Sequence, residues 1–398
     1  MIKTIDECFS LIQNGANIKQ GDVDGGFPIT RIETITNDKF SRDRMGYAGI
    51  TDISKYTSYL LEDGDLLMSH INSVQYLGRT VLYVKQSDET IIHGMNLLRL
   101  KARRDVINPA YAKYCFYGHP FRSQIRKITK KSVNQASFAV KDLKQIKLNI
   151  PALSEQNEIV MILDKIQQVL AHRIDELSKL DDLIKARFVE MFGDVRENPN
   201  GYAVVPFIDI VEYMGDIGSN GANKVVVEHL DMKDEEDYAM MVRFTNFTKN
   251  DFADDVKYIS KDAYDFFKKS QIFGGELIIC KIGSAGQNYV MPFLDRPVSL
   301  GLNQIMVRIK ENILMPYLYQ YLHTDYGEFL ISGCINGAVT KTITKTELKK
   351  IPVMLPPMEI QKEFESFVKQ VDKSKVKVQK ALDETQKLFD SLMQQYFG

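Results

Sequence analysis

The sequence has no tryptophan and few residues that could build a metal or redox centre. Its four cysteines lie far apart and form no CxxC pair: Cys8, Cys115, Cys280 and Cys334. The six histidines are equally scattered. Such spacing argues against both a disulfide framework and a zinc site. We therefore predict no metal-binding residues in this chain.

Long apolar runs and a strong charge bias are also missing. No apolar stretch reaches the roughly 20 residues needed to cross a membrane. The first residues, MIKTIDECFSLIQNG, lack the basic start and apolar block of a secretory signal. We therefore expect a cytoplasmic protein with no membrane partner. The net charge of −1 neither requires nor excludes nucleic acid, because binding depends on local patches.

One long stretch occurs twice in the 398 residues. Residues 151–193 and 356–398 align after a shift of 205 positions, which places Gln156 on Gln361. In both copies apolar residues recur every three or four positions with charged residues between them. This pattern predicts two amphipathic helices of about 39 residues, each roughly 58 Å long.

Neither helix can bury so long an apolar stripe alone. We predict that the two pack against each other as an antiparallel coiled coil. The alternative is that each helix covers only its own domain. Ser154 and Glu359 are the candidate N-cap residues.

The regions outside these helices repeat more loosely. Matching positions share a residue type and a local pattern: Arg31 and Arg243, Gly94 and Gly301, Pro109 and Pro316, Tyr114 and Tyr321, and Leu143 and Leu348. Short strands separated by turn residues are predicted at 66–69, 80–84 and 96–100, with a helix at about 109–118. The pattern therefore predicts an α+β protein built as a tandem repeat. Its predicted segments are a first globular domain (1–150), a helix (151–193), a second globular domain (194–355) and a second helix (356–398).

Several motifs could be mistaken for catalytic or cofactor sites. Asn108-Pro109-Ala110-Tyr111 approximates the tetrapeptide with which adenine methyltransferases hold a flipped base. An N-cap Asn followed by Pro at the first helical position explains it equally well. The glycine-rich stretches 215–221 and 283–286 lack the Gly-Lys-Ser/Thr ending of a phosphate loop. We predict no catalytic residue and no cofactor-binding residue.

Basic residues gather in the last part of each globular domain. Together with neighbouring amides and hydroxyls they offer phosphate contacts and groups able to read base edges. A solvated basic face would have the same composition. The DNA-binding candidates are Arg31, Arg122, Arg126, Lys127, Lys130, Lys131, Asn134, Gln135, Arg243, Lys341, Thr342 and Lys345.

The whole chain resembles the specificity subunit of type I restriction-modification systems. The residues that carry the resemblance are Ile150-Pro151 with Glu155-Gln156, Leu355-Pro356-Pro357 with Gln361, and Phe397-Gly398. The resemblance implies two target-recognition domains, each reading one half of a bipartite double-stranded DNA target, with the paired helices setting the spacer. It also implies one copy per complex, with a pseudo-two-fold relation inside the chain. Two modification subunits would dock on it, together with restriction subunits. S-adenosylmethionine, ATP and magnesium would be bound by those partners.

A non-catalytic DNA-recognition subunit is therefore the leading hypothesis. The alternative is a coiled-coil scaffold whose duplicated heads bind other proteins. It explains the helices and the repeat equally well. It does not explain the basic run between Arg122 and Lys147.

Overall fold

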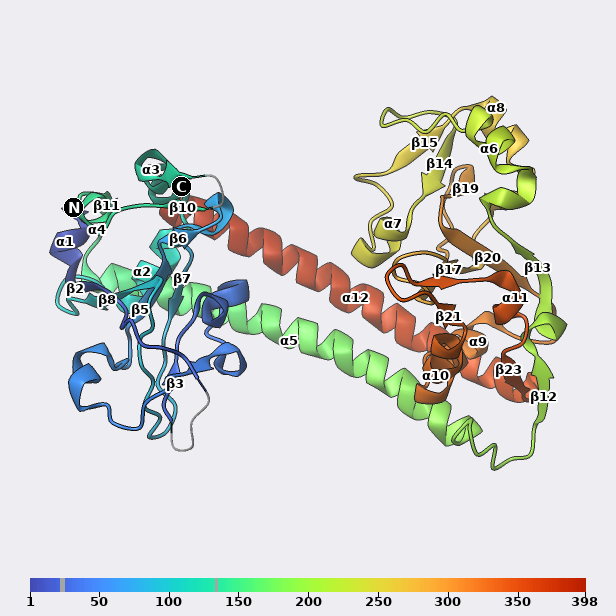
Figure 1. Ribbon diagram of the computed structural model, residues 1–398, viewed down its shortest axis with the longest axis horizontal. Helices are drawn as coiled ribbons and strands as arrows, with labels where there is room; N and C mark the ends of the chain where they lie inside the picture. Colours follow the sequence, from blue (N-terminus) through green and yellow to red (C-terminus); the bar gives the residue numbers. More distant parts are fainter. Residues whose placement is uncertain (22–25, 133–134) are drawn as a thin grey trace. The chain divides into compact units, whose positions relative to one another are not determined.

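A computed structural model of the protein describes residues 1–21, 26–132 and 135–398 (Figure 1). It divides into two compact units. The first contains Met1–Asp175 and Gln379–Gly398, and the second contains Glu176–Val378. The predicted long helices are confirmed: α5 (Leu153–Phe192) and α12 (Met358–Phe397) each have 40 residues, and each contributes to both units.

The predicted N-cap residues are wrong, because both helices begin earlier than expected. Ser154 and Glu359 lie inside the first turn and not before it. The carbonyls of the preceding segment already accept the first helical hydrogen bonds, from the N–H of Gln156 to Ala152 and from the N–H of Gln361 to Pro357. Ser154 and Glu359 therefore have helical neighbours on both sides.

The first unit is built on a four-stranded antiparallel sheet with the order β2-β8-β5-β7. Its strands are β1 (Ile2–Thr4), β2 (Phe9–Asn14), β3 (Pro28–Ile29), β4 (Gly46–Tyr47), β5 (Leu66–Ser69), β6 (Ile71–Asn72), β7 (Thr80–Leu82), β8 (Leu97–Ala102), β9 (Lys130–Lys131), β10 (Ala136–Ser137) and β11 (Lys147–Asn149). Its α-helices, besides its part of α5 and α12, are α1 (Ile5–Cys8), α2 (Pro109–Tyr117), α3 (His119–Ile128) and α4 (Val140–Lys144). Short 3-10 helices are η1 (Ile32–Asp38), η2 (Arg42–Arg44), η3 (Ser54–Tyr59) and η4 (Val74–Tyr76). The three predicted strands and the predicted helix correspond to β5, β7, β8 and α2.

The second unit repeats this frame with the sheet β13-β20-β17-β18 and adds a second sheet, β15-β14-β19-β16. Its strands are β12 (Ala203–Pro206), β13 (Val211–Gly215), β14 (Ala239–Val242), β15 (Lys257–Ile259), β16 (Gln271–Ile272), β17 (Leu277–Cys280), β18 (Asn288–Val290), β19 (Val298–Leu300), β20 (Gln304–Ile309), β21 (Ile335–Asn336), β22 (Thr342–Ile343) and β23 (Pro352–Leu355). Its helices are η5 (Phe207–Ile210), η6 (Ile217–Asn220), α6 (Asn223–His229), α7 (Phe244–Lys249), α8 (Lys261–Phe266), η7 (Lys268–Ser270), α9 (Met315–Leu322), α10 (Asp325–Gly333) and α11 (Lys345–Leu348). At the matching place the described residues of the first unit form the β3–β4 pair, isolated bridges such as Ile29 with Ile92, and 3-10 turns.

Segments of α5 and α12 pack antiparallel inside each unit. In the second unit Asp181 of α5 pairs with Lys375 of α12 at 2.5 Å, and Arg187 pairs with Glu363 at 2.7 Å. The residue numbers of the partners in α12 therefore decrease as those in α5 increase, as in an antiparallel pair. In the first unit Ile159 and Leu163 of α5 and Phe397 of α12 belong to one buried core. The fold class predicted from the sequence is confirmed.

A buried glutamine fastens each long helix to its unit in the same way. The Oε1 atom of Gln156 accepts a hydrogen bond from the N–H of Asn108 at 2.8 Å, and its Nε2 donates to the carbonyls of Val106 and Pro151 at 3.0 and 2.9 Å. Gln361 makes the equivalent bonds to Leu314 (2.8 Å), Asn312 (3.4 Å) and Pro356 (2.8 Å). The most specific residues of the sequence repeat therefore have a structural role.

These bonds also correct the alignment of α2 with α9 by one residue. Because the N–H of Asn108 and the N–H of Leu314 meet equivalent glutamines, Pro109 corresponds to Met315 and not to Pro316. Proline is tolerated at either of the first helical positions, so matching the prolines was misleading.

Candidate nucleic-acid interface

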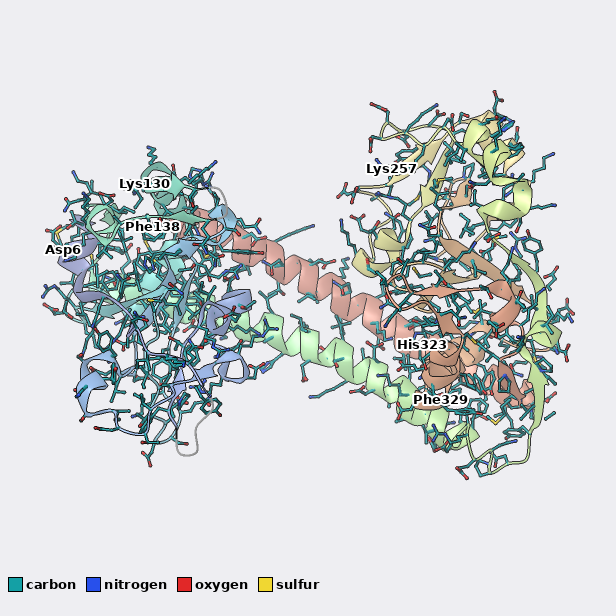
Figure 2. The ribbon with its side chains drawn as sticks, viewed as in Figure 1. Asp6, Lys130, Phe138, Lys257, His323 and Phe329 are labelled. Atoms are coloured by element: carbon teal, nitrogen blue, oxygen red, sulfur yellow. The ribbon has the colours of Figure 1, made fainter. Side chains whose placement is uncertain are left out.

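A β-ribbon formed by two strands carries two of the basic candidates of the first unit, Lys130 and Lys131. In this first ribbon, β9 pairs with β10, placing Lys131 opposite Ala136 and Lys130 opposite Ser137. The other edge of β10 pairs with β6. Lys130 and Lys131 are exposed, and Figure 2 shows Lys130 at the surface of the unit. The ribbon is therefore anchored on one edge while its lysines face solvent.

The tip of the first ribbon is polar. The carbonyl of Gln135 accepts hydrogen bonds from both the N–H and the hydroxyl of Ser132, each at 2.8 Å. The side chain of Gln135 is exposed and available for contacts. The candidate Asn134 lies outside the residues that the structure describes.

Helix α3 leads directly into this ribbon and presents two further cations. Arg126 and Lys127 lie in its last turn, where positive charge is favoured, and both are exposed. Arg122, one turn earlier, is partly buried. Its Nη1 donates to the carbonyl of Leu77 at 2.9 Å, and its guanidinium lies 5.2 Å from the ring centre of Tyr117. Arg122 therefore supports α3 from inside the unit, whereas Arg126 and Lys127 extend the basic surface of the ribbon.

The second unit carries an equivalent ribbon formed by β21 and β22. Asn336 lies opposite Thr342, and the N–H of Gly283 donates to the carbonyl of Lys341 at 3.1 Å. Gly337 at the turn has φ 100°, a conformation that favours glycine. Lys341 is exposed, while Thr342 is partly buried with its hydroxyl 3.4 Å from the carbonyl of Asn336.

The base of each ribbon is held by the same backbone bond. The N–H of Phe138 donates to the carbonyl of His70 at 3.2 Å, and the N–H of Ile343 donates to the carbonyl of Lys281 at 3.0 Å. A short helix follows each ribbon, α4 in the first unit and α11 in the second. The backbone arrangement of the two ribbons is therefore the same, but the residues at their tips differ. The first ribbon has polar Ser132 and Gln135, and the second has Val339, which is 97% exposed.

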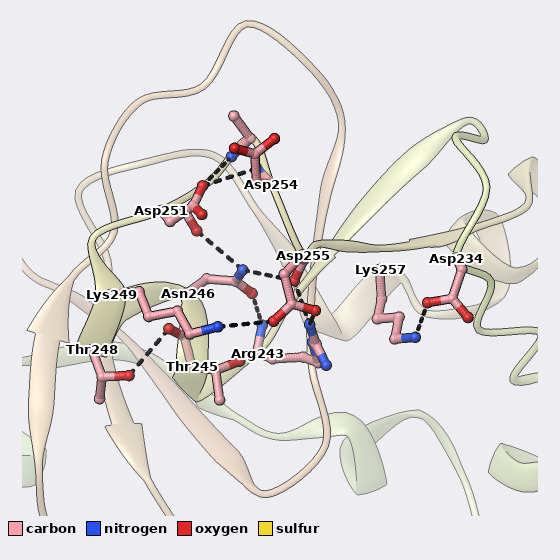
Figure 3. A network of polar contacts seen from close by, with 11 residues as sticks. Asp234, Arg243, Thr245, Asn246, Thr248, Lys249, Asp251, Asp254, Asp255 and Lys257 are labelled. Carbon is pink, nitrogen blue, oxygen red and sulfur yellow. Dashed lines mark hydrogen bonds and ion pairs between the residues drawn. The ribbon is translucent and has the colours of Figure 1, made fainter. Parts of the chain in front are cut away.

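Arg31 and Arg243 occupy equivalent positions with different surroundings. The N–H of Arg31 donates to Oγ1 of Thr34, and that of Arg243 donates to Oδ1 of Asn246, both at 2.8 Å. The guanidinium of Arg243 is bound to the backbone carbonyl and the carboxylate of Asp255, the latter at 3.0 Å (Figure 3). Arg243 therefore closes a polar network within its own unit.

The Arg31 side chain is exposed and lies against Gly46, where an added Cβ would come within 2.2 Å of Nε. In Figure 1, β3, which precedes Arg31, and α3 lie at opposite ends of the first unit. The structure therefore separates Arg31 from the ribbon candidates. It brings together Arg126, Lys127, Lys130, Lys131 and Gln135 in one unit, and Lys341 and Thr342 in the other.

Lys345 follows the second ribbon but faces inward. Its Nζ lies 2.8 Å from Oδ1 of Asp216 and 3.1 Å from the hydroxyl of Ser219. The other oxygen of Asp216 binds Nζ of Lys281 at 2.8 Å. Burial opposes ionisation of Asp216, but the hydrogen bonds from the two lysines outweigh it and lower its pKa to about 2. The sequence reasoning missed Asp216, because it lies in a glycine-rich stretch that looks like an ordinary turn.

The motifs with a possible catalytic reading have structural roles. Oδ1 of Asn108 accepts from the N–H of Ala110 at 2.8 Å, as an N-cap does. Tyr111 is buried, with its ring centre 5.2 Å from that of Phe397. Neither side chain is placed to receive a flipped base. Gly283 and Gly286 have φ near 86° and 89°, as expected of turn glycines.

Within residues 1–21, 26–132 and 135–398 we find no cluster of His, Cys, Asp or Glu arranged to hold a metal ion. Among the same residues, no helix is both long and apolar enough to span a membrane. Burial raises the pKa of Cys8 to about 11 and that of Cys115 to about 12, so these thiols are unreactive near neutral pH.

The fold is therefore a tandem repeat of an α+β unit, in which a β-ribbon with exposed lysines recurs and two long helices contribute to both units. Residues 1–180 and 211–385 match the family described as type I restriction modification DNA specificity domain. The chain belongs to this family, whose members are non-catalytic specificity subunits.

Two relatives illustrate the family at the level of sequence. The chain is 26% identical over 388 residues to the putative type I restriction enzyme MjaX specificity subunit of Methanocaldococcus jannaschii, covering 93% of this chain and 86% of that protein. It is 25% identical over 162 residues to the type I restriction enzyme EcoKI specificity subunit of Escherichia coli strain K12, covering 40% and 34%.

Solved structures show the same fold at low sequence identity. The S subunit of a type I restriction-modification system from M. genitalium has a TM-score of 0.57 and 13% identity, with 100% of this chain and 96% of that chain covered. A chain from a study of complex assembly and conformational transition of the type I R-M system has a TM-score of 0.53 and 15% identity, covering 100% and 97%.

Proposed function

We propose that this protein is the sequence-specific DNA-recognition subunit of a type I restriction-modification complex, with each unit reading one half of a bipartite target. The observation that carries the proposal is the β-ribbon that recurs at the same place in both units and presents exposed lysines, Lys130 and Lys131 in the first unit and Lys341 in the second. The family match supports DNA recognition over the alternative of a protein-binding scaffold.

The ribbons suit double-stranded DNA in charge. The major groove admits a two-stranded β-ribbon, and in the first unit β9 is the edge strand of the sheet β6-β10-β9 and carries exposed Lys130 and Lys131. Lys130, Lys131 and Lys341 are exposed, and none forms an ion pair with another described residue. Such cations bind phosphates and release counterions, which positions the protein without reading sequence. Sequence would then be read by neighbouring groups that differ between the units, among which Gln135 is a candidate.

The long helices are proposed to dock two modification subunits and to set the spacing of the half-sites. Leu183 of α5 and Leu388 of α12 are equivalent by the shift of 205 residues, and they are 47% and 51% exposed. One belongs to each unit. An exposed leucine repeated in this way supports a partner that binds twice. The modification subunits would supply S-adenosylmethionine, and restriction subunits would add ATP- and magnesium-dependent chemistry.

Domain exchange tests the proposal. The chain is purified with its modification subunit, and residues 206–350 are replaced by the same region of a related subunit. Protection of DNA should shift in one half-site only, here called the second half-site, because the first unit is unchanged. Equal affinity of the unaltered complex for all sequences would refute sequence-specific recognition, and a change in both halves would refute independent reading.

Insertion of seven residues into each long helix tests the spacing. Seven residues add about 10 Å of helix, or roughly three base pairs. The expected result is a longer spacer between unchanged half-sites, measured by mapping methylated adenines in cells that carry the altered chain. An unchanged spacer would contradict this part of the proposal.

A further inference from the structure

A buried ionic cluster lies under the base of the second ribbon. The carboxylate of Asp216 is bound by Lys281 at one oxygen and by Lys345 at the other, both at 2.8 Å. The hydroxyl of Ser219 donates to Oδ1 of the same carboxylate at 3.0 Å. Only 9% of the Asp216 side chain is exposed, whereas the side chains of Lys281 and Lys345 are 37% and 34% exposed, so the carboxylate is buried and its two partners reach the surface.

The two lysines belong to the two segments that hold the ribbon. The carbonyl of Lys281 accepts the bond from Ile343 in β22, and residue 282 forms a bridge with Thr342. Lys345 lies two residues beyond β22 and begins α11. The carboxylate of Asp216 therefore joins the segment that pairs with β22 and the helix that follows β22 at one point.

Asp216 also connects this point to the part of the unit that differs most from the first unit. It precedes η6, and its carbonyl accepts a hydrogen bond from the hydroxyl of Ser270 at 3.3 Å. Ser270 ends η7 and in turn accepts a bond from Nδ2 of Asn220 at 2.6 Å. These bonds link the ribbon base to the segments that flank the extra sheet β15-β14-β19-β16.

The first unit has no such charges at the matching positions. His70 takes the place of Lys281, as their shared backbone bond to the ribbon shows, and Val140 takes the place of Lys345. His70 is buried, and burial lowers its pKa to about 4, so the imidazole is neutral near pH 7. An uncharged contact is therefore sufficient to support a ribbon, and the cluster is a feature of the second unit alone among the described residues.

We propose that Asp216 is a positioning residue for recognition of the second half-site, which fixes the second ribbon relative to the extra sheet and withholds Lys281 and Lys345 from DNA phosphates. The inference rests on the proposed function. Without the carboxylate, both lysines would turn to solvent and to DNA. Sequence-independent binding would become stronger while discrimination at the second half-site would weaken.

The substitution Asp216→Asn tests this in the full chain bound to its modification subunit. The probes are a duplex carrying the mapped bipartite site and two duplexes with one half scrambled. We expect discrimination against the scrambled second half to fall about tenfold or more, with the first half unaffected. Because each phosphate contact contributes roughly 0.9 to the slope of log K against log salt, we expect that slope to steepen by up to about 1.8.

Asp231→Asn is the matched control. Asp231 is a carboxylate of the same unit that accepts from the N–H of Ser260 and pairs with Lys233 at 3.3 Å; Ser260 precedes α8 and Lys233 forms a bridge with Tyr258 of β15. It should leave both the slope and the discrimination unchanged. A purely structural role of Asp216 would lower thermal stability while both DNA readouts stay at their original values, and that result would overturn the inference.

A neutral variant covers the case in which Asp216→Asn does not fold. Asp216→Asn combined with Lys281→Gln and Lys345→Gln keeps hydrogen-bonding groups and removes the charges. We expect this variant to retain the salt slope of the unaltered protein, whereas a slope that steepens without the lysines would contradict our reasoning. If the unaltered complex itself shows no sequence preference, the proposed function fails, and the result is distinct from failure of the Asp216 inference.

Discussion

The glutamines that join the long helices to the two units offer the sharpest test of the fold. Gln156 and Gln361 are both fully buried, and each makes three hydrogen bonds to backbone groups. Replacement by leucine keeps the approximate volume and removes all three bonds. The backbone groups left behind, one N–H and two carbonyls, lose their only side-chain partner at the buried glutamine position.

The expected cost follows from the number of these groups. A hydrogen bond contributes about 1 kcal/mol net, but a buried group left without a partner costs roughly 1–3 kcal/mol. The extra apolar surface of leucine offsets part of this. We therefore expect Gln156→Leu and Gln361→Leu each to lower the free energy of unfolding by about 3–5 kcal/mol.

Replacement of Gln156 by glutamate gives a pH-dependent version of the test. Its carboxylate can still accept from the N–H of Asn108, but it cannot donate to the two carbonyls while ionised. Burial raises its pKa above the usual value of about 4.3, so its penalty is present at neutral pH and is lost as pH falls through the folded pKa. The Gln156→Glu protein should therefore gain stability relative to the unaltered protein as the solution is acidified.

Chemical denaturation combined with hydrogen exchange measures both the size and the place of the effect. Gln156→Leu should increase exchange in β8 of the first unit, and Gln361→Leu should do so in β20 of the second. The exposed Gln145→Leu serves as the control and should change stability by less than about 0.5 kcal/mol. A loss below about 1 kcal/mol for both buried positions, or increased exchange in the wrong unit, would refute the reasoning.

Three further predictions concern DNA, assembly and pH. Lys131→Gln and Lys341→Gln should each weaken binding for all sequences and reduce the slope of log K against log salt by about 0.9, measured by fluorescence anisotropy; an unchanged slope would remove that lysine from the interface. Leu183→Glu and Leu388→Glu should each reduce the number of bound modification subunits from two to one, measured by native mass spectrometry, and two retained copies would contradict docking at the leucines. Burial lowers the pKa of His93 to about 3, so the unfolded chain binds its proton first as pH falls below about 6.5. Because of His93, the free energy of unfolding should then fall by up to about 1.4 kcal/mol per pH unit between pH 6.5 and 3. Urea titrations at pH 7 and pH 5 measure this fall, which should be smaller in the His93→Gln protein.

The sequence predicted the elements of this protein better than it predicted the role of individual residues. The apolar period of the helices and the short strands around the turn glycines depend on local pattern, and both are found in the structure. Gly94 and Gly301 were matched correctly between the copies because no other residue fits there. An added Cβ would lie 2.1 Å from the carbonyl oxygen of Thr30 at Gly94 and of Val242 at Gly301. Matching prolines failed because the first helical turn accepts proline at more than one position.

Charged candidates were harder to place, because a lysine looks the same in sequence whether it faces solvent or a buried carboxylate. Lys341 and Lys345 are four residues apart in a basic run, yet one is exposed and the other pairs with Asp216, 129 residues away. Nothing in the local pattern distinguishes them. Only the fold brings the partner carboxylate to one of the two.

The same limit explains why Arg31 and Arg243 match in sequence and differ in chemistry. Both precede a helical turn and donate the same backbone hydrogen bond to the side chain three residues on, a bond that does not involve the guanidinium. In the second unit Asp255 neutralises the guanidinium, and in the first unit the side chain is exposed. A shared backbone frame therefore does not require a shared DNA contact. If the units read different half-sites, the groups that distinguish them should be sought where the partners of equivalent residues differ. Asp255→Asn removes the negative charge beside the Arg243 guanidinium and keeps its bond to the backbone carbonyl, and it should alter binding to the second half-site and leave the first unchanged.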